Sequence, residues 1–321
     1  MDQNLTPVPE QEPQTERRRP ARVDRRGHSP LPLIVSAAAL AVACAALFLA
    51  WPRQAETPPE PEPEFVPAMA VHAEPVEYIT YRGHQLPIDE GLAVNDLDKS
   101  AFVREGDRVT YETEERTALQ GIDVSAHQRE IDWNQVADSG IDFAILRLGF
   151  RGYGAEGSLN VDERFHANMK GALAAGLKVG VYFFSQATDV SEAEAETRLL
   201  LRELEGYEVT FPVVFDWERI QDSAARTNAV NSKTITLMAE TFCAQIEQAG
   251  YTPGVYFNQD MGYLELELGR LADYSFWLAE YDERPDFHYR FDLWQYSSSG
   301  TVPGIEGKVD LNLAFTDFGE K

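Results

Sequence analysis

The feature that most limits how this chain can fold is a series of short, β-rich apolar runs that begins at residue 121. These runs occupy residues 121–125, 143–149, 178–185, 212–218, 253–258, 275–281, 291–297 and 308–315. Segments with a helical pattern separate the earlier runs, and strands that alternate with helices are typical of α/β proteins with parallel strands. We therefore predict an α/β fold from residue 121 onward.

Two of the intervening segments have an especially clear helical face. One carries Phe165, Met169, Leu173 and Gly176, and the other carries Ile235, Met238, Phe242 and Ile246. Gly176 and Gly250 are expected to end these helices. After the sixth and seventh runs the gaps are too short for a crossover helix, so the last part of the sheet should close through loops or antiparallel pairing. The expected fold is an eight-stranded modified TIM-like barrel, (β/α)5(β)3, with about five helices.

Four acidic residues lie at the ends of the predicted strands, where barrel enzymes place their active sites. Asp216 and Glu218 close the run PVVFDWE, and their positions two residues apart put them on one face of a strand, about 6.6 Å apart. Asp123 lies in the first run and Asp310 in the eighth, which are neighbours in a closed barrel. Crowding should keep at least one of these carboxyls protonated, as the general acid of glycoside hydrolysis requires.

Five stretches of the sequence carry a resemblance to a known family. They are GIDVSAHQREIDWNQV, FAILRLGFRGYG, AAGLKVGVYFFSQA, FPVVFDWE and LWQYSSSGTVPGIEGKVDLN. In this order they closely resemble the glycoside hydrolase family 25 lysozymes, the Chalaropsis-type N-acetylmuramidases, over residues 121 to about 318. The resemblance implies a barrel with five helices and hydrolysis of the β-1,4 bond between N-acetylmuramic acid and N-acetylglucosamine in peptidoglycan.

The resemblance also implies roles for the four acids. Glu218 would be the general acid, and Asp216 would stabilise positive charge or orient the acetamido group of the substrate. Asp123 and Asp310 would complete the acidic cleft. One departure is Arg129, which stands where the family commonly has a glycine.

Aromatic residues near the strand ends are candidates for binding sugar, because flat side chains stack on the apolar faces of pyranose rings. The candidates are Tyr182, Trp277, Tyr281, Trp294 and Tyr296, together with Gln295 as a hydrogen-bonding residue. Aromatic residues in strands usually fill the core, so about half of this set is expected to reach ligand. Tyr182 and Tyr281 are the preferred ones.

Other classes of function are less well supported by the sequence. A net charge of −25 argues against a nucleic-acid partner. The histidines are isolated and form no zinc motif, and no phosphate clamp accompanies the acids, so we predict no metal and no cofactor. A metal-dependent barrel hydrolase and a noncatalytic wall-binding module remain the alternatives. Cys44 and Cys243 lie far apart and predict no structural disulfide.

The first part of the chain predicts a membrane anchor. A basic tail, residues 1–30, precedes an uncharged apolar run, residues 31–51, long enough to cross a bilayer as one helix. Basic residues ahead of this span predict a cytoplasmic amino terminus and an extracytoplasmic remainder at the cell membrane. A cleaved signal peptide and lipid attachment at Cys44 are the alternatives.

Beyond the predicted span, residues 52–77 form a Pro- and Glu-rich linker and residues 78–120 a partly ordered lead-in. The catalytic domain is expected at residues 121–321. We expect this domain to be monomeric and to act on peptidoglycan glycan strands.

Overall fold

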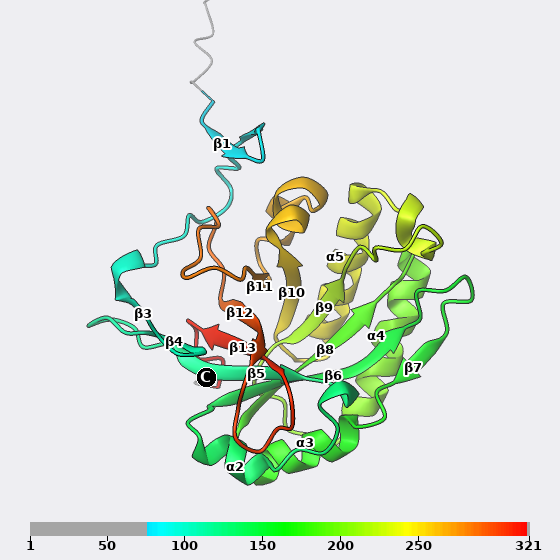
Figure 1. The fold of residues 1–321 in the computed structure, drawn as a ribbon. Coiled ribbons are helices and arrows are strands. Elements are labelled where there is room, and N and C mark those ends of the chain that lie inside the picture. Colours follow the sequence, from blue (N-terminus) through cyan, green and yellow to red (C-terminus); the bar gives the residue numbers. More distant parts are fainter. Residues whose placement is uncertain (1–75, 320–321) are drawn as a thin grey trace, which may run out of the picture. The chain divides into compact units, whose positions relative to one another are not determined.

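A closed ring of eight strands forms the centre of the computed structural model, which describes residues 76–319 (Figure 1). The ring consists, in order, of β5 (Leu119–Val124), β6 (Phe143–Arg151), β8 (Lys178–Ser185), β9 (Val213–Trp217), β10 (Pro253–Asn258), β11 (Ser275–Ala279), β12 (Leu293–Gly300) and β13 (Val309–Ala314). Pairing of β13 with β5 closes the ring. The predicted eight-stranded barrel is confirmed.

The direction of the last strand differs from that of all the others. From β5 through β12, every neighbouring pair is parallel, whereas β13 runs antiparallel to both β12 and β5. The connection between β12 and β13 spans only residues 301–308, which is too short to return the chain to the opposite end of the barrel. The predicted antiparallel closure is therefore confirmed, and β13 begins at the rim where the parallel strands end. We call this edge the carboxyl rim and the opposite edge the floor.

Helices follow the first four strands of the ring, and they lie outside it (Figure 1). They are α2 (Trp133–Asp138), α3 (Phe165–Ala174), α4 (Val190–Leu204) and α5 (Ser232–Gln248). The predicted helical faces are buried except for Leu173, which is half-buried, and Gly176, which is exposed beyond the end of α3. Gly176 and Gly250 follow the helix ends with positive φ angles. Cys243 is fully buried in α5, as expected of a small apolar side chain.

The prediction of about five helices is wrong in one place. Between β10 and β11 the described chain forms a π-helical turn, η4 (Met261–Glu265), and a 3-10 turn, η5 (Leu268–Leu271), where a fifth α-helix was expected. Gly262 and Gly269 lie in this segment, and glycine disfavours a regular helix. A Cβ at Gly262 would approach the Phe257 ring to 2.9 Å, and a Cβ at Gly269 would approach Asp89 Oδ2 to 2.3 Å, so a larger residue at either position would require a neighbouring side chain to shift.

Aromatic side chains fill the floor of the barrel. Phe143 at the start of β6 stacks on Phe211, just before β9, with 4.6 Å between ring centroids. Phe318, which follows β13, packs edge-on against Phe211 at 5.3 Å. Asp317 forms an ion pair with Lys178 at the start of β8. The last described residues therefore lie against the floor.

Residues 78–117 form two hairpins, which we call the arm (cyan in Figure 1). The first hairpin pairs β1 (Tyr78–Tyr81) with β2 (His84–Pro87), and the second pairs β3 (Phe102–Glu105) with β4 (Arg108–Tyr111). Between them, η1 (Lys99–Ala101) is a short turn. The remaining short elements are β7 (Leu159–Val161), η2 (Ala126–Gln128) and η3 (Arg226–Ala229). The arm is thus ordered up to the start of the barrel.

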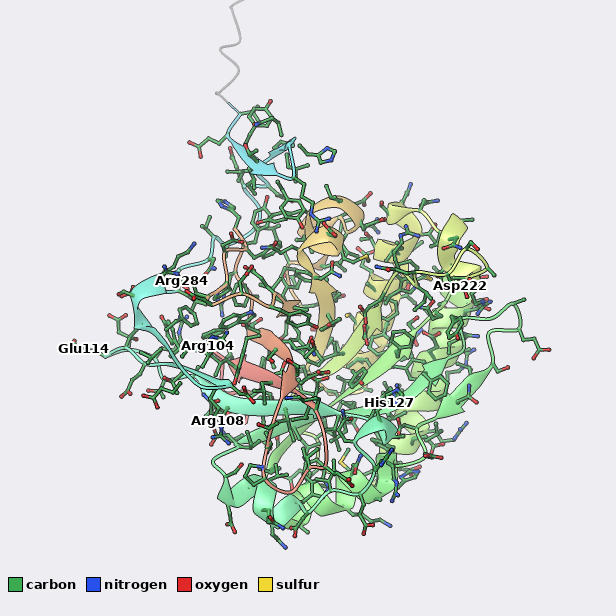
Figure 2. All side chains as sticks on the ribbon, viewed as in Figure 1. Arg104, Arg108, Glu114, His127, Asp222 and Arg284 are labelled. Atoms are coloured by element: carbon green, nitrogen blue, oxygen red, sulfur yellow. The ribbon has the colours of Figure 1, made fainter. Side chains whose placement is uncertain are left out.

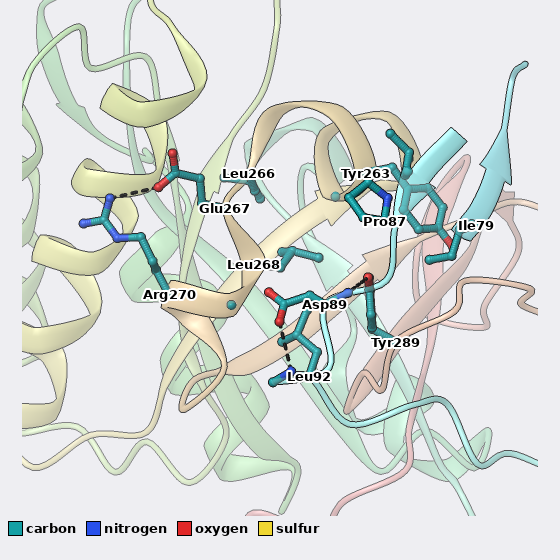
Figure 3. Close-up of a pocket in the computed structure, with 14 residues that line it drawn as sticks. Ile79, Pro87, Asp89, Leu92, Tyr263, Leu266, Glu267, Leu268, Arg270 and Tyr289 are labelled. Carbon is teal, nitrogen blue, oxygen red and sulfur yellow. Dashed lines mark hydrogen bonds and ion pairs between the residues drawn. The ribbon is translucent and has the colours of Figure 1, made fainter. Parts of the chain in front are cut away.

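The arm is joined to the barrel by hydrogen bonds and by aromatic packing. Val94 forms an isolated bridge with Tyr289, and the backbone N–H of Asp89 donates to the Tyr289 hydroxyl at 2.9 Å (Figure 3). A crevice of about 430 Å³ remains between the arm and the turns η4 and η5. Further along, Phe102 packs edge-on against Trp294, with 5.4 Å between centroids. The arm therefore packs against the barrel.

In residues 76–319 no helix is both long enough and apolar enough to cross a membrane. The predicted basic tail, the predicted membrane span at 31–51 and nearly all of the predicted linker lie outside the described residues. These assignments stay predictions.

Replacing Phe102 by Ala is expected to destabilise the folded protein by about 2 kcal/mol, because it empties a half-buried site between the arm and the barrel. Urea unfolding followed by circular dichroism measures this change. Val103 on the same strand is 51% exposed, so Val103→Ala should change the free energy of unfolding by less than about 0.5 kcal/mol. Equal effects of the two substitutions would show that the arm does not pack on the barrel.

Candidate active site

The four predicted acids lie together at the carboxyl rim. Asp123 is near the end of β5, Asp216 is in β9, Glu218 follows β9 directly and Asp310 is the second residue of β13. All four line one cavity of about 430 Å³, which we call the acid cavity. The crevice beside the arm has a similar volume but shares no residue with the acid cavity.

The alternation of residues along β9 explains why Asp216 faces inward. Val214 packs inside the barrel, whereas Phe215 packs outside against Phe242 of α5. Asp216 follows the inward direction of Val214, since side chains alternate along a strand. Trp217 turns outward again and donates its indole N–H to the Ala187 carbonyl at 2.9 Å. Asp216 therefore reaches the cavity from within β9, and Glu218 reaches it from the position just after the strand ends.

Asp123 and Asp310 form a close pair across the closing strands. They are directly opposed in the register of β5 and β13. Burial, together with the neighbouring Asp310 carboxylate, raises the pKa of Asp123 well above its usual value. Amide N–H groups of Gln295 and Asn312, each donating to Asp123 Oδ2 at 2.8 Å, oppose this rise. Burial also raises the pKa of Asp310, so this pair keeps a proton to a higher pH than two isolated carboxyls would.

The pKa values of Asp216 and Glu218 are also raised. Burial and then the Glu218 charge raise the pKa of Asp216 well above its usual value, and Asp216 Oδ1 is buried without a hydrogen-bond partner. Burial and then the Asp310 charge raise the pKa of Glu218, which is only half-buried. The cavity therefore favours protonated carboxyls in the pH range where ordinary acids are ionised, as the sequence predicted.

Arg147 is the cationic side chain that faces these acids. It lies in β6 and lines the acid cavity. Its Nε and Nη2 atoms both donate to Asp162 Oδ2 at 2.8 Å, and the Asp162 side chain is fully buried. Its positive charge opposes the rise in the pKa of Asp216. Sequence reasoning missed Arg147, although a single charge within the apolar run FAILRLG was a usable signal.

The two preferred aromatic candidates line the cavity. Tyr182 is half-buried in β8, and Tyr281 follows β11 with 56% of its surface exposed. The hydroxyls of Tyr281 and Tyr256 donate to Gln295 Oε1 at 2.7 and 2.9 Å. Gln295 is 3% exposed and holds Asp123, so it connects the tyrosines to the acids. Tyr256 was not anticipated from the sequence.

Trp277 and Tyr296 do not line the acid cavity. Trp277 is buried beneath Tyr182 and Tyr256, and its indole N–H donates to Asn312 Oδ1 at 2.9 Å. Tyr296 is buried against Trp294, with the Arg104 guanidinium 5.8 Å from its ring centroid. Trp294, the third aromatic candidate outside the cavity, is fully buried and donates its indole N–H to the Glu280 carbonyl at 2.7 Å. The structure therefore brings together Asp123, Asp216, Glu218, Asp310, Tyr182, Tyr281 and Gln295.

Further residues, which the sequence did not predict as substrate-binding residues, line the rim of the cavity. These are His127, Tyr153, Phe184 and Ile220. His127, labelled in Figure 2, lies just beyond β5 in η2. At the end of η2, Arg129 has φ +58°, a conformation in which glycine is unstrained, so the departure noted in the sequence falls on a glycine-like turn. Among residues 76–319, no group of three or more His, Cys, Asp or Glu side chains is arranged to hold a metal ion.

Carboxyls of raised pKa, gathered at the carboxyl rim of a closed barrel beside tyrosine side chains, form an arrangement that suits a glycoside hydrolase. The family model of glycosyl hydrolases family 25 matches residues 122–305, which is more than half of the chain. The chain belongs to glycosyl hydrolases family 25.

Relatives of this chain include a protein named as a lysozyme. The uncharacterized protein YegX of Escherichia coli K12 is 31% identical over 206 residues, covering 61% of this chain and 69% of its own. Lysozyme M1 of Streptomyces globisporus is 28% identical over 245 residues, covering 72% and 76%. The autolysin LytC of Streptococcus pneumoniae superposes with a TM-score of 0.55 at 24% identity, over 66% of this chain and 52% of LytC. This chain thus spans about half of LytC, and the likeness shows a common fold.

Replacing Asp216 by Asn is expected to stabilise the protein at neutral pH but not near pH 3. Burial raises the pKa of Asp216, so the folded protein keeps the Asp216 proton to a higher pH than the unfolded chain does. In the unfolded chain the pKa of an aspartate is about 3.9. As the pH rises above the unfolded pKa, ionisation of Asp216 lowers the stability of the wild-type protein, whereas the asparagine in the variant does not ionise. Urea unfolding at several pH values should show a gain on the order of 1 kcal/mol at pH 7.

The control for this measurement is Asp273→Asn, at an exposed position remote from the acid cavity. It should follow the wild-type dependence on pH. A gain from Asp216→Asn that is equally large at pH 3 would contradict the assignment.

Proposed function

We propose that this protein is a lysozyme that hydrolyses the β-1,4 bond between N-acetylmuramic acid and N-acetylglucosamine in peptidoglycan. The observation that carries the proposal is the acid cavity, in which four carboxyls share a buried site at the carboxyl rim. Membership of glycosyl hydrolases family 25 and the similarity to Lysozyme M1 support this choice of substrate.

In the proposed reaction, Glu218 donates its proton to the glycosidic oxygen that leaves. Its raised pKa supports this role, because a general acid must still be protonated at the working pH. Glu218 is also the less buried member of the D-x-E pair, so it lies where a sugar can approach it. After proton transfer it becomes a carboxylate.

Asp216 has a different role in this proposal. It stabilises the positive charge that develops on the sugar ring or orients the acetamido group of the substrate. Burial and the Glu218 charge raise the pKa of Asp216, and the nearby Arg147 cation offsets part of this rise in favour of the ionised form. Asp123 and Asp310 complete the cleft, and the proton that this pair keeps limits the negative charge that the substrate meets.

We also propose that the catalytic domain is held outside the cytoplasm by the apolar segment at 31–51, with the Pro- and Glu-rich linker as a tether. The arginines before this segment and its lack of charge support the proposal. Tethering matters because an acidic domain gains no electrostatic attraction to an anionic cell wall. Anchoring supplies the high local concentration instead.

Purified peptidoglycan digested with this protein is expected to release fragments whose new reducing end is N-acetylmuramic acid. Reduction with borohydride followed by mass spectrometry identifies that sugar. Glu218→Gln should lower the rate by roughly a thousandfold or more and keep the wild-type circular dichroism spectrum, because only the proton donor is lost. Asp216→Asn should lower the rate by about a hundredfold or more.

Glu114→Gln is the matched control, since Glu114 is an exposed glutamate on the arm (Figure 2). This variant should digest peptidoglycan at the wild-type rate, and a chelator should not slow any active protein. Wild-type rates in Glu218→Gln would refute the assignment of the acid. Loss of activity in the chelator would favour a metal-dependent hydrolase, and binding to the wall without release of fragments would favour a noncatalytic module.

Expressed with its natural amino terminus, the full chain is expected to sediment with membranes and to resist extraction by high salt. Protease added outside the cell should remove the catalytic domain, since that domain is expected beyond the membrane. Immunoblots of membrane, medium and protease-treated fractions give the answer. A shortened chain in the medium would show a cleaved signal peptide, and retention lost on replacing Cys44 by Ala would show a lipid anchor.

A further inference from the structure

Tyr153 stands at the rim of the acid cavity and has no role in the proposed proton transfer. It lies just beyond β6, in the turn formed by residues 152–158. The side chain lines the cavity and is 52% exposed. Within residues 76–319 its ring has no aromatic partner, and its hydroxyl makes no hydrogen bond. An unengaged aromatic ring is thus presented beside the acids.

A buried ion pair holds the turn that carries Tyr153. Arg151 is 5% exposed, and its Nε donates to Glu196 Oε1 of α4 at 2.6 Å. The other guanidinium nitrogens donate to the Gly157 carbonyl at 2.7 Å and to the Glu192 carbonyl at 2.9 Å. One arginine therefore ties the far side of the turn to α4.

Arg226 fixes the same turn from another loop. Its backbone N–H donates to the Tyr153 carbonyl at 3.2 Å, and its guanidinium donates to Glu192 Oε1 at 2.6 Å. Gly157 allows this approach, because a Cβ there would lie 1.8 Å from Arg226 Nη1. The turn is consequently held at two points, and the ring of Tyr153 is presented from a fixed backbone.

The strands that precede Tyr153 and Tyr281 lie on opposite sides of the ring. Tyr153 extends from β6 and Tyr281 follows β11, which are the second and sixth strands counted from β5. In a ring of eight these two positions are diametrically opposed. The acids come from β9 on one side of the line between these two strands and from β5 and β13 on the other.

We propose that Tyr153 stacks on a sugar ring of the glycan strand, on the opposite side of the acids from Tyr281. The inference rests on the proposed function and extends it. A glycan strand that contacts both tyrosines passes over the acids. The enzyme therefore binds long glycan strands more tightly than short fragments and cuts them at internal bonds. Because the turn is already held in place, little ordering cost opposes this contact.

Kinetics on soluble, peptide-free glycan strands test the proposal. Tyr153→Ala is expected to raise KM roughly tenfold, equivalent to about 1.4 kcal/mol, and to leave kcat within about twofold. Tyr153→Phe keeps the ring and should restore the wild-type KM. Tyr78→Ala, at a tyrosine of the arm that is 54% exposed and remote from the acid cavity, should also have the wild-type KM. Thermal unfolding of all three should match wild type.

A second measurement separates this inference from the proposed function. Affinity for the same strands is measured by calorimetry with Glu218→Gln and with Glu218→Gln combined with Tyr153→Ala. A roughly tenfold weaker affinity of the double variant supports the stacking contact, even if wild type proves unable to cut the strands. Equal affinities, a wild-type KM in Tyr153→Ala, or a Tyr153→Phe variant as impaired as Tyr153→Ala would each overturn it.

Discussion

The active site depends on the way the barrel closes. The last strand, β13, must fit between β12 and β5, and the short connection before it forces an antiparallel direction. As a result its second residue, Asp310, lies at the carboxyl rim beside Asp123. A parallel strand would carry Asp310 at the floor instead. The geometry that seals the sheet is therefore the same geometry that assembles the acids and raises their pKa values.

Much of this arrangement could be predicted from local sequence. The apolar runs indicate the eight strands, and the spacing of Asp216 and Glu218 indicates a shared face. Spacing alone could not place Trp277 and Tyr296, because an aromatic residue near a strand end serves the core as readily as a cleft. Trp277 faces inward but is covered by Tyr182 and Tyr256, and Tyr296 faces outward. Which layer covers a ring is decided by strands distant in sequence.

Residues that link distant strands were the hardest to anticipate. Gln295 was expected to be a hydrogen-bonding residue for sugar; in the structure it is buried and joins Asp123 to two tyrosine hydroxyls. Arg147 balances part of the acidic charge only because Asp162, fifteen positions away in sequence, holds it in place. In both cases the role comes from partners that meet only after the barrel has closed. Sequence patterns describe each strand separately and do not show which residues of different strands come into contact.

The direction of β13 has a practical consequence at the other end of the barrel. The strand carries the chain from the cleft down to the floor, where Phe318 and Asp317 pack beneath the ring. A reporter protein or affinity handle fused after this point would emerge on the side away from the acids. Such a fusion leaves the entrance to the cleft unobstructed, so the carboxyl end is the better attachment point for immobilising or labelling this enzyme.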